Sequence, residues 1–204
     1  MNDDKSKVIK IENNYAFIDS QNLNIGTQKV GWKIDWRKFR KYLAENYGVK
    51  EAYLFIGYMS ENEDIYEYMH DLGYLVVLKQ IVDNRNEEDK LNPDNSTVTS
   101  KTEKQPESDA GKSNTVKGNI DADLVLYAMK EIPNYNKAVI VSGDGDFLSL
   151  CEYLIDQNKL LAIMTPNWMY SSLYKQLDKW IVRLDLSKKK LSYKKKIKFR
   201  NKKN

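Results

Sequence analysis

The chain has 204 residues, of which 41% are hydrophobic, and this is enough for one domain of ordinary size with a buried core. Its single cysteine, Cys151, excludes an intramolecular disulfide and a cysteine-rich zinc site, and favours a reducing, cytoplasmic setting. The formal net charge is only +4, and no window approaches the roughly 18 apolar residues that a membrane span needs, so we expect a soluble protein without a membrane partner.

The first half of the chain alternates between apolar runs and amphipathic segments, behind a polar N-terminal extension at 1–14. This alternation is typical of a parallel α/β sheet. Asp35 and Gly48 are expected to begin and end the first helix. In order, the sequence predicts a strand at 15–19, a loop at 20–34, a helix at 35–48, a strand at 51–59, a helix at 61–73 and a strand at 74–82.

The segment at 83–116 interrupts this pattern. It is rich in Asn, Asp, Ser, Thr, Glu and Lys and almost lacks large apolar side chains. Such a composition does not bury enough surface to offset the entropy of ordering, so we expect a disordered insertion inside one domain. A domain boundary is the alternative, although neither flank is a complete sheet.

Alternation returns after the insertion, where Asn119 is a possible helix cap and Pro133 a helix end. The expected fold is a three-layer α/β/α sandwich with a mainly parallel sheet, formed by residues 15–186. Its second half is predicted to contain a helix at 117–132, a strand at 137–146, a helix at 147–158, a strand at 159–166, a helix at 169–180 and an edge strand at 181–186.

Four aspartates fall where functional groups gather in such a sheet, beyond the carboxyl ends of the strands. Asp19 ends the first strand, Asp144 and Asp146 follow the strand that begins at residue 137, and Asp121 lies in the expected first turn of a helix that starts at the same edge. Uncompensated, these carboxylates would repel one another. A divalent ion removes the conflict, and Mg²⁺ or Mn²⁺ prefers such hard oxygen ligands.

Each acid also has an ordinary structural explanation. Asp146 could cap the helix that follows it, and Asp121 could complement a helix dipole. Asp19 is harder to explain in this way, because it precedes a predicted loop and caps no evident helix. Gly145 is expected to let the chain turn sharply between its two acidic neighbours. Lys117 is either a phosphate contact or a loop lysine.

Other catalytic designs have little support. His70 is the only histidine and has no nearby candidate nucleophile, which argues against a Ser/His/Asp or Cys/His mechanism. Cys151 lies in an apolar segment and is expected to be a small buried hydrophobic residue. A P-loop is absent, because GDGDF carries acids where a phosphate-binding loop needs uncharged backbone donors.

The motifs FIDSQNL, KGNIDADLVLYAM and VSGDGDFLSL, followed by LLAIMTP and SSLYKQLDKWI, resemble the NYN domain, the LabA-like branch of the PIN-like nuclease superfamily. The resemblance runs from about residue 15 to 185. It implies a PIN-like fold, Mg²⁺- or Mn²⁺-dependent ribonuclease activity and RNA as partner. By motif it implies six site residues: Asp19, Asn22, Asp121, Ser142, Asp144 and Asp146. The four acids are expected to bind the metal, Asn22 to contact and position substrate or water, and Ser142 to bond a ligand carboxylate at the substrate site.

The charge is concentrated at the C-terminal end. Residues 187–204 hold ten of the 33 basic residues and none of the acidic ones, which leaves 23 basic and all 29 acidic residues to the rest. A tail of this kind is usually solvated and attracts polyanions such as RNA. The sequence therefore predicts a metal-dependent ribonuclease that acts endonucleolytically on single-stranded RNA. The alternative is a non-catalytic RNA-binding or adaptor module on the same fold, and a phosphatase or a DNA-directed flap nuclease is a more distant one.

Overall fold

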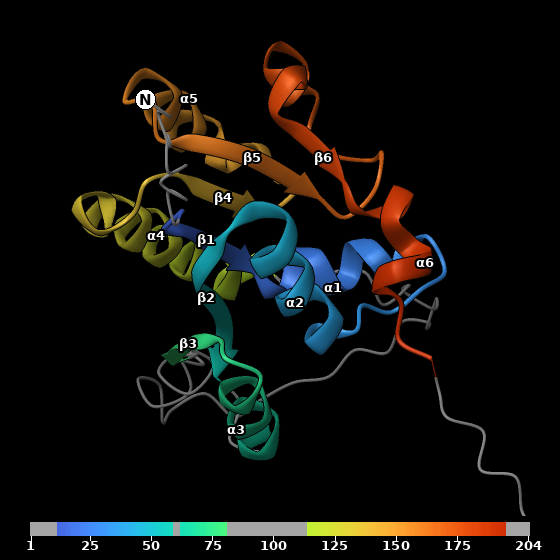
Figure 1. The fold of residues 1–204 in the computed structure, drawn as a ribbon. Helices are drawn as coiled ribbons and strands as arrows, with labels where there is room; N and C mark the ends of the chain where they lie inside the picture. Colours follow the sequence, from blue (N-terminus) through green and yellow to red (C-terminus); the bar gives the residue numbers. More distant parts are fainter. Residues whose placement is uncertain (1–11, 59–61, 81–113, 195–204) are drawn as a thin grey trace, which may run out of the picture.

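Six strands form one entirely parallel sheet in the computed structural model, which describes residues 12–58, 62–80 and 114–194 (Figure 1). The strand order is β3-β2-β1-β4-β5-β6. The chain leaves β1 toward β2 on one side and later returns to β4 on the other, so the order reverses between β1 and β4. The strands are β1 Asn14–Asp19, β2 Val49–Tyr58, β3 Leu75–Gln80, β4 Ala138–Val141, β5 Leu160–Thr165 and β6 Ile181–Arg183.

Helices cover both faces of the sheet and confirm the expected three-layer α/β fold (Figure 1). In β1, Ala16 and Ile18 point into one core while Phe17 points into the other, and none of the three is exposed. The first core packs against α1 Ser20–Lys29, α2 Trp36–Tyr47, α3 Glu63–Asp71 and α6 Lys188–Leu191, and the second against α4 Asn114–Lys130 and α5 Leu148–Asp156.

The predicted loop at 20–34 is wrong over most of its length, because α1 begins directly after β1. Asp19 is its N-cap: the carboxylate Oδ1 accepts a hydrogen bond from the backbone N–H of Asn22 at 2.9 Å. The segment is poor in strong helix formers, but Leu23 and Thr27 are fully buried against the sheet. Tertiary packing therefore stabilises a helix that the local sequence does not announce.

The helix predicted at 35–48 is confirmed, as are its N-cap at Asp35 and its end at Gly48. The Asp35 carboxylate accepts a hydrogen bond from the backbone N–H of Lys38 at 3.1 Å, which caps α2. Gly48 ends the helix with φ of 59°, in the left-handed region that favours glycine. Phe39 and Leu43, one helical turn apart, are fully buried.

The start of α4 differs from the prediction. The helix begins at Asn114, so Asn119 lies inside it and is not its cap. Asp121 is consequently the eighth residue of α4, in the third turn rather than the first. The predicted insertion at 83–116 lies outside the described residues except for its last three positions, which belong to this helix.

The chain after β4 contains more 3-10 helix than expected. β4 ends at Val141, and a short 3-10 helix, η5 Gly145–Phe147, precedes α5. The helix predicted at 169–180 is a 3-10 segment, η6 Ser172–Trp180, with non-helical dihedral angles at Leu177.

The first residues of the basic segment 187–204 pack on the domain. Leu191 of α6 is 1% exposed, and its carbonyl accepts a hydrogen bond from the backbone N–H of Asp35 at 2.8 Å. Two residues later the N–H of Tyr193 bonds the carbonyl of Lys33. Residues 188–194 are thereby anchored at the start of α2. Among the described residues, none of the helices has the length and apolar character to cross a membrane.

The buried tyrosines predict a loss of stability at alkaline pH. Tyr74 is 1% exposed and burial raises the pKa of its phenol above the ordinary value of about 10. The folded protein therefore holds this proton at a pH where the unfolded chain releases it. We expect the free energy of unfolding to be fully present below about pH 10 and to fall above it, by up to about 1.4 kcal/mol per pH unit for each such group.

Urea unfolding followed by circular dichroism between pH 8 and 11 measures this dependence. Tyr74→Phe loses the hydrogen bond from its hydroxyl to the Trp36 carbonyl, worth about 1 kcal/mol, but its stability should fall less steeply above pH 10. Tyr193→Phe, at a tyrosine that is 59% exposed, should keep the wild-type slope. Equal slopes in all three proteins would contradict the prediction.

Candidate functional site

The candidate site lies at the carboxyl ends of β1, β4 and β5, an edge of the sheet that we call the rim. The strand order reverses between β1 and β4, and open α/β sheets bind ligands in the crevice at such a point. A pocket of about 310 Å³ lies there, lined by Asp19, by residues of α1, by Gly143 and by residues from 166 to 170 after β5. The pocket therefore has walls from both sides of the reversal.

Asp19 and Asp144 are connected at the rim through one hydroxyl. The Asp19 side chain is almost fully buried, at 4% exposed, and its Oδ2 accepts a hydrogen bond from Ser142 Oγ at 3.2 Å. Ser142 is itself fully buried, and its Oγ accepts from the backbone N–H of Asp144 at 3.1 Å. The end of β1 and the turn after β4 are thus held together by a polar network.

Asn22 connects the same two segments a second time. Its Oδ1 accepts a hydrogen bond from the backbone N–H of Gly143 at 2.8 Å. Asn22 also lines the pocket. The asparagine that was predicted to contact substrate therefore orders the turn that carries Asp144.

The two acids of SGDGD have different surroundings. The Asp144 carboxylate accepts a hydrogen bond from the N–H of Asp146 at 3.3 Å and caps η5, while its carbonyl accepts from Tyr174 Oη at 2.5 Å. Asp146 is exposed. Both the side chain and the backbone carbonyl of Asp144 therefore stabilise the turn, whereas Asp146 is exposed to solvent.

Gly145 allows close packing beside the turn. Its φ is not positive, so the expected special conformation is absent. A Cβ at this position would overlap Ser171 Oγ and lie 2.9 Å from Leu173 Cδ1. The glycine allows the start of η6 to approach the turn.

The remaining predicted residues come from α4. Asp121 is half-buried on this helix, which packs against η5, whereas Asp123 forms an ion pair with Lys79, with an Nζ to Oδ2 distance of 3.0 Å. Lys117 lies in the same helix, and its side chain is outside the described part. Within the described ranges, no group of three or more His, Cys, Asp or Glu side chains could hold a metal ion. The four-carboxylate site stays a prediction.

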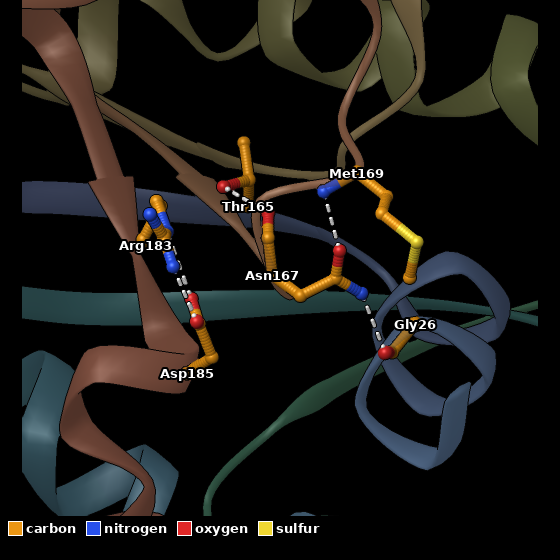
Figure 2. Close-up of polar contacts among 6 residues, drawn as sticks. All are labelled: Gly26, Thr165, Asn167, Met169, Arg183 and Asp185. Carbon is orange, nitrogen blue, oxygen red and sulfur yellow. Dashed lines mark hydrogen bonds and ion pairs between the residues drawn. The ribbon is translucent and has the colours of Figure 1, made fainter. Parts of the chain in front are cut away.

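Asn167 is a buried polar residue of this region that sequence reasoning missed. Its side chain, 4% exposed, accepts a hydrogen bond from the N–H of Met169 at 2.6 Å and donates one to the carbonyl of Gly26 at 2.7 Å (Figure 2). A Cβ on Gly26 would lie 2.5 Å from Pro166 Cβ, so only glycine allows this approach. Asn167 and Gly26 therefore hold α1 against the segment after β5.

Neither of the two residues of other catalytic designs is among those that line the pocket. Cys151 is fully buried, and burial raises the pKa of its thiol to about 12, which keeps it protonated at neutral pH. His70 is exposed on α3, which packs beside the edge strand β3. Neither has the setting of a catalytic nucleophile or base at the rim.

Comparisons with known proteins agree with this architecture. Residues 15–184 match the family model described as the NYN domain. The chain is 26% identical over 170 residues to the low amplitude and bright protein LabA of Synechococcus elongatus, covering 81% of this chain and 80% of that protein. A crystal structure of a protein of unknown function from Vibrio parahaemolyticus has the same fold, with a TM-score of 0.60 and 18% identity over 86% of this chain and 95% of that one.

The hydrogen bond from Gly143 to Asn22 predicts that two asparagines of α1 contribute unequally to the free energy of unfolding. Asn22→Ala should lower the free energy of unfolding by about 1 kcal/mol or more, because the Gly143 N–H loses its partner in a partly buried site. Asn24→Ala removes an exposed side chain that, among the described residues, accepts a hydrogen bond from Gln28 alone, and it should change stability by less than about 0.5 kcal/mol. Urea unfolding compares them, and equal losses would contradict the role of Asn22.

Proposed function

Since the chain belongs to the NYN domain family of PIN-like nucleases, we propose that it is a metal-dependent ribonuclease that cuts single-stranded RNA internally. One observation carries the proposal: at the reversal of strand order, the Ser142 hydroxyl links the Asp19 carboxylate to the backbone N–H of Asp144. Asp19 also lines the adjacent pocket. A phosphodiester in this crevice would meet the ordered carboxylate of Asp19, beside the turn that carries Asp144.

The donors at the rim suit a hard divalent cation. Mg²⁺ and Mn²⁺ take carboxylate oxygens, and Mg²⁺ usually keeps several waters and binds through one or two carboxylates together with substrate phosphate. The proposed ligands are Asp19 and Asp144, with contributions from Asp121 and Asp146. When bound, such an ion polarises a phosphate and lowers the pKa of a coordinated water.

The protein supplies orientation. Asp19 accepts one hydrogen bond on each carboxylate oxygen, from Asn22 and from Ser142, so its side chain has a fixed direction. Ser142 and Asn22 hold the turn that presents Asp144, and we propose that Asn22 also contacts the substrate from the pocket wall. Lys117 is proposed to contact a phosphate. Side chains that are already held in fixed positions reduce the reorganisation needed when the substrate binds.

A second candidate function is a non-catalytic RNA-binding or adaptor module. The observation that favours it is that Asp19 and Asp144 both cap helices, which explains two of the acids without a metal. Thermal unfolding with added Mn²⁺ separates the two functions. A catalytic site should be stabilised by the ion, and the Asp144→Asn variant should lose this stabilisation. Comparison of RNA, DNA and small phosphate esters tests the phosphatase and DNA nuclease alternatives.

Asp144→Asn is the sharpest test of catalysis. Asparagine keeps an oxygen that can accept the hydrogen bond from the Asp146 N–H, so the cap of η5 is preserved while the negative charge is lost. Cleavage of a single-stranded RNA in Mn²⁺ or Mg²⁺ should fall by at least about 100-fold, in the range typical for loss of a group that stabilises the transition state. Asp156→Asn, at the exposed end of α5, should cut at the wild-type rate.

The matched pair also identifies contamination. A trace nuclease would remain in every preparation and would not depend on the substituted residue. Residual activity that is equal in wild type, Asp144→Asn and Asp156→Asn would remove the catalytic proposal and leave the binding module.

The basic C-terminal segment predicts a salt-dependent contribution to RNA binding. Deletion of residues 195–204 removes six of its ten basic residues and leaves the buried Leu191 in place. RNA affinity should fall, and the slope of log affinity against log salt should flatten by about 0.7 for each lost phosphate contact. A full-length variant with the same six residues changed to Gln controls for chain length. Unchanged affinity and slope in both variants would exclude the segment from RNA binding.

A further inference from the structure

Two exposed apolar side chains face the pocket from opposite walls. Ile25 of α1 is 44% exposed and Met169, after β5, is 57% exposed, and both line the pocket. The Met169 side chain extends from its segment toward α1, beside Gly26 (Figure 2). Apolar side chains that stay exposed around a concave site are typical of a ligand-binding surface.

The spacing between the walls is fixed by buried contacts. Asn167 bonds both Met169 and Gly26, and Pro166 packs directly on Gly26. The Thr165 hydroxyl in turn donates to the Asn167 carbonyl at 3.2 Å (Figure 2). The pocket is therefore formed before a ligand arrives, which lowers the entropic cost of binding.

One side of α1 places three kinds of side chain along the pocket. Gln21, Ile25 and Lys29 follow one another at intervals of four residues, so they lie on one face of the helix, and all three line the pocket. They supply, in order, an amide with donors and an acceptor, an apolar surface and a cation. A nucleotide presents the complementary groups: a polar base edge, an apolar base face and a phosphate.

We propose that this pocket binds the base of one RNA nucleotide next to the rim, with the base between Ile25 and Met169, its edge on Gln21 and a phosphate on Lys29. The inference rests on the proposed function and names the part of the substrate that the pocket selects. The volume of about 310 Å³ lies at the lower end of the roughly 300–1,000 Å³ range of ligand pockets, which suits one nucleotide rather than a duplex. Asp19 lines the same pocket, so a nucleotide bound there lies next to this carboxylate, with its base edge at the Asp19 end of α1.

Nuclear magnetic resonance of the methionine methyl groups tests this binding without cleavage. The full chain is labelled with ¹³C-methyl methionine and titrated with adenosine 5′-monophosphate in the presence of EDTA. A base that stacks on Met169 should shift its methyl resonance upfield in a saturable way, because the ring current acts only at close range. The Met129 methyl on α4, a side chain that is 37% exposed on the other face of the sheet, should not move. The Met169→Leu variant assigns the resonance.

Ribose 5-phosphate separates binding of the base from binding of phosphate. It should leave the Met169 methyl unshifted, because it has no aromatic ring. Lys29→Ala should weaken nucleotide binding about tenfold or more, the loss expected for a contact with a charged group, whereas Lys50→Ala should have no effect. Lys50 is also exposed but lies at the start of β2, on the opposite edge of the sheet.

The outcomes distinguish this inference from the proposed function. Absence of a saturable Met169 shift, an equal shift at Met129, or an equal shift with ribose 5-phosphate would each overturn the nucleotide pocket. RNA cleavage that persists beside such a result leaves the ribonuclease intact. Conversely, a specific Met169 shift in a protein that cuts no RNA supports the pocket and removes the catalytic proposal.

Discussion

The hydrogen bonds of the Asp19 carboxylate are the constraint on which the rim depends. A carboxylate that is 4% exposed must have partners, because an unsatisfied buried charge costs far more than a single hydrogen bond contributes. One oxygen accepts from the backbone at the start of α1 and the other from the hydroxyl of Ser142. The same residue thus ends β1, begins α1 and holds the turn after β4.

Because the Asp19 side chain has these structural hydrogen bonds, Asn substitutions at Asp19 and at Asp144 are expected to have different effects. Asparagine at position 144 keeps the oxygen that caps η5, so its effect is largely one of charge. Asparagine at position 19 would present an amide N–H₂ group to the Ser142 hydroxyl, which now donates to Asp19 and accepts from the Asp144 N–H. Loss of function at Asp19 would therefore mix structural and chemical causes, whereas loss at Asp144 is easier to assign.

Local signals predicted those parts of the fold that local chemistry determines. The Asp35 cap, the Gly48 terminator and the alternation of apolar segments gave the correct α2 and the correct parallel sheet. The helix α1 was missed because its stability comes from Leu23 and Thr27 packing on strands that follow much later in the chain. The hydrogen bond from Asn167 to Gly26 joins residues 141 positions apart in the sequence, so a local sequence pattern does not predict it either. Its one local signal is an asparagine whose side chain bonds the backbone two residues on, as in an Asx turn.

The missed helix has consequences for recognition. A loop at 20–34 would have left Gln21, Ile25 and Lys29 without a defined relation, whereas α1 aligns them along one wall of the pocket. The end of this wall also meets the basic segment, because Lys188 of α6 bonds the carbonyl of Gly31, two residues beyond Lys29, at 3.3 Å. Buried Leu191 holds α6 in that place. The exposed lysines of α6 therefore begin near Lys29, the cationic end of the pocket, so a polyanion attracted to them would lie next to the pocket rather than at an arbitrary part of the surface.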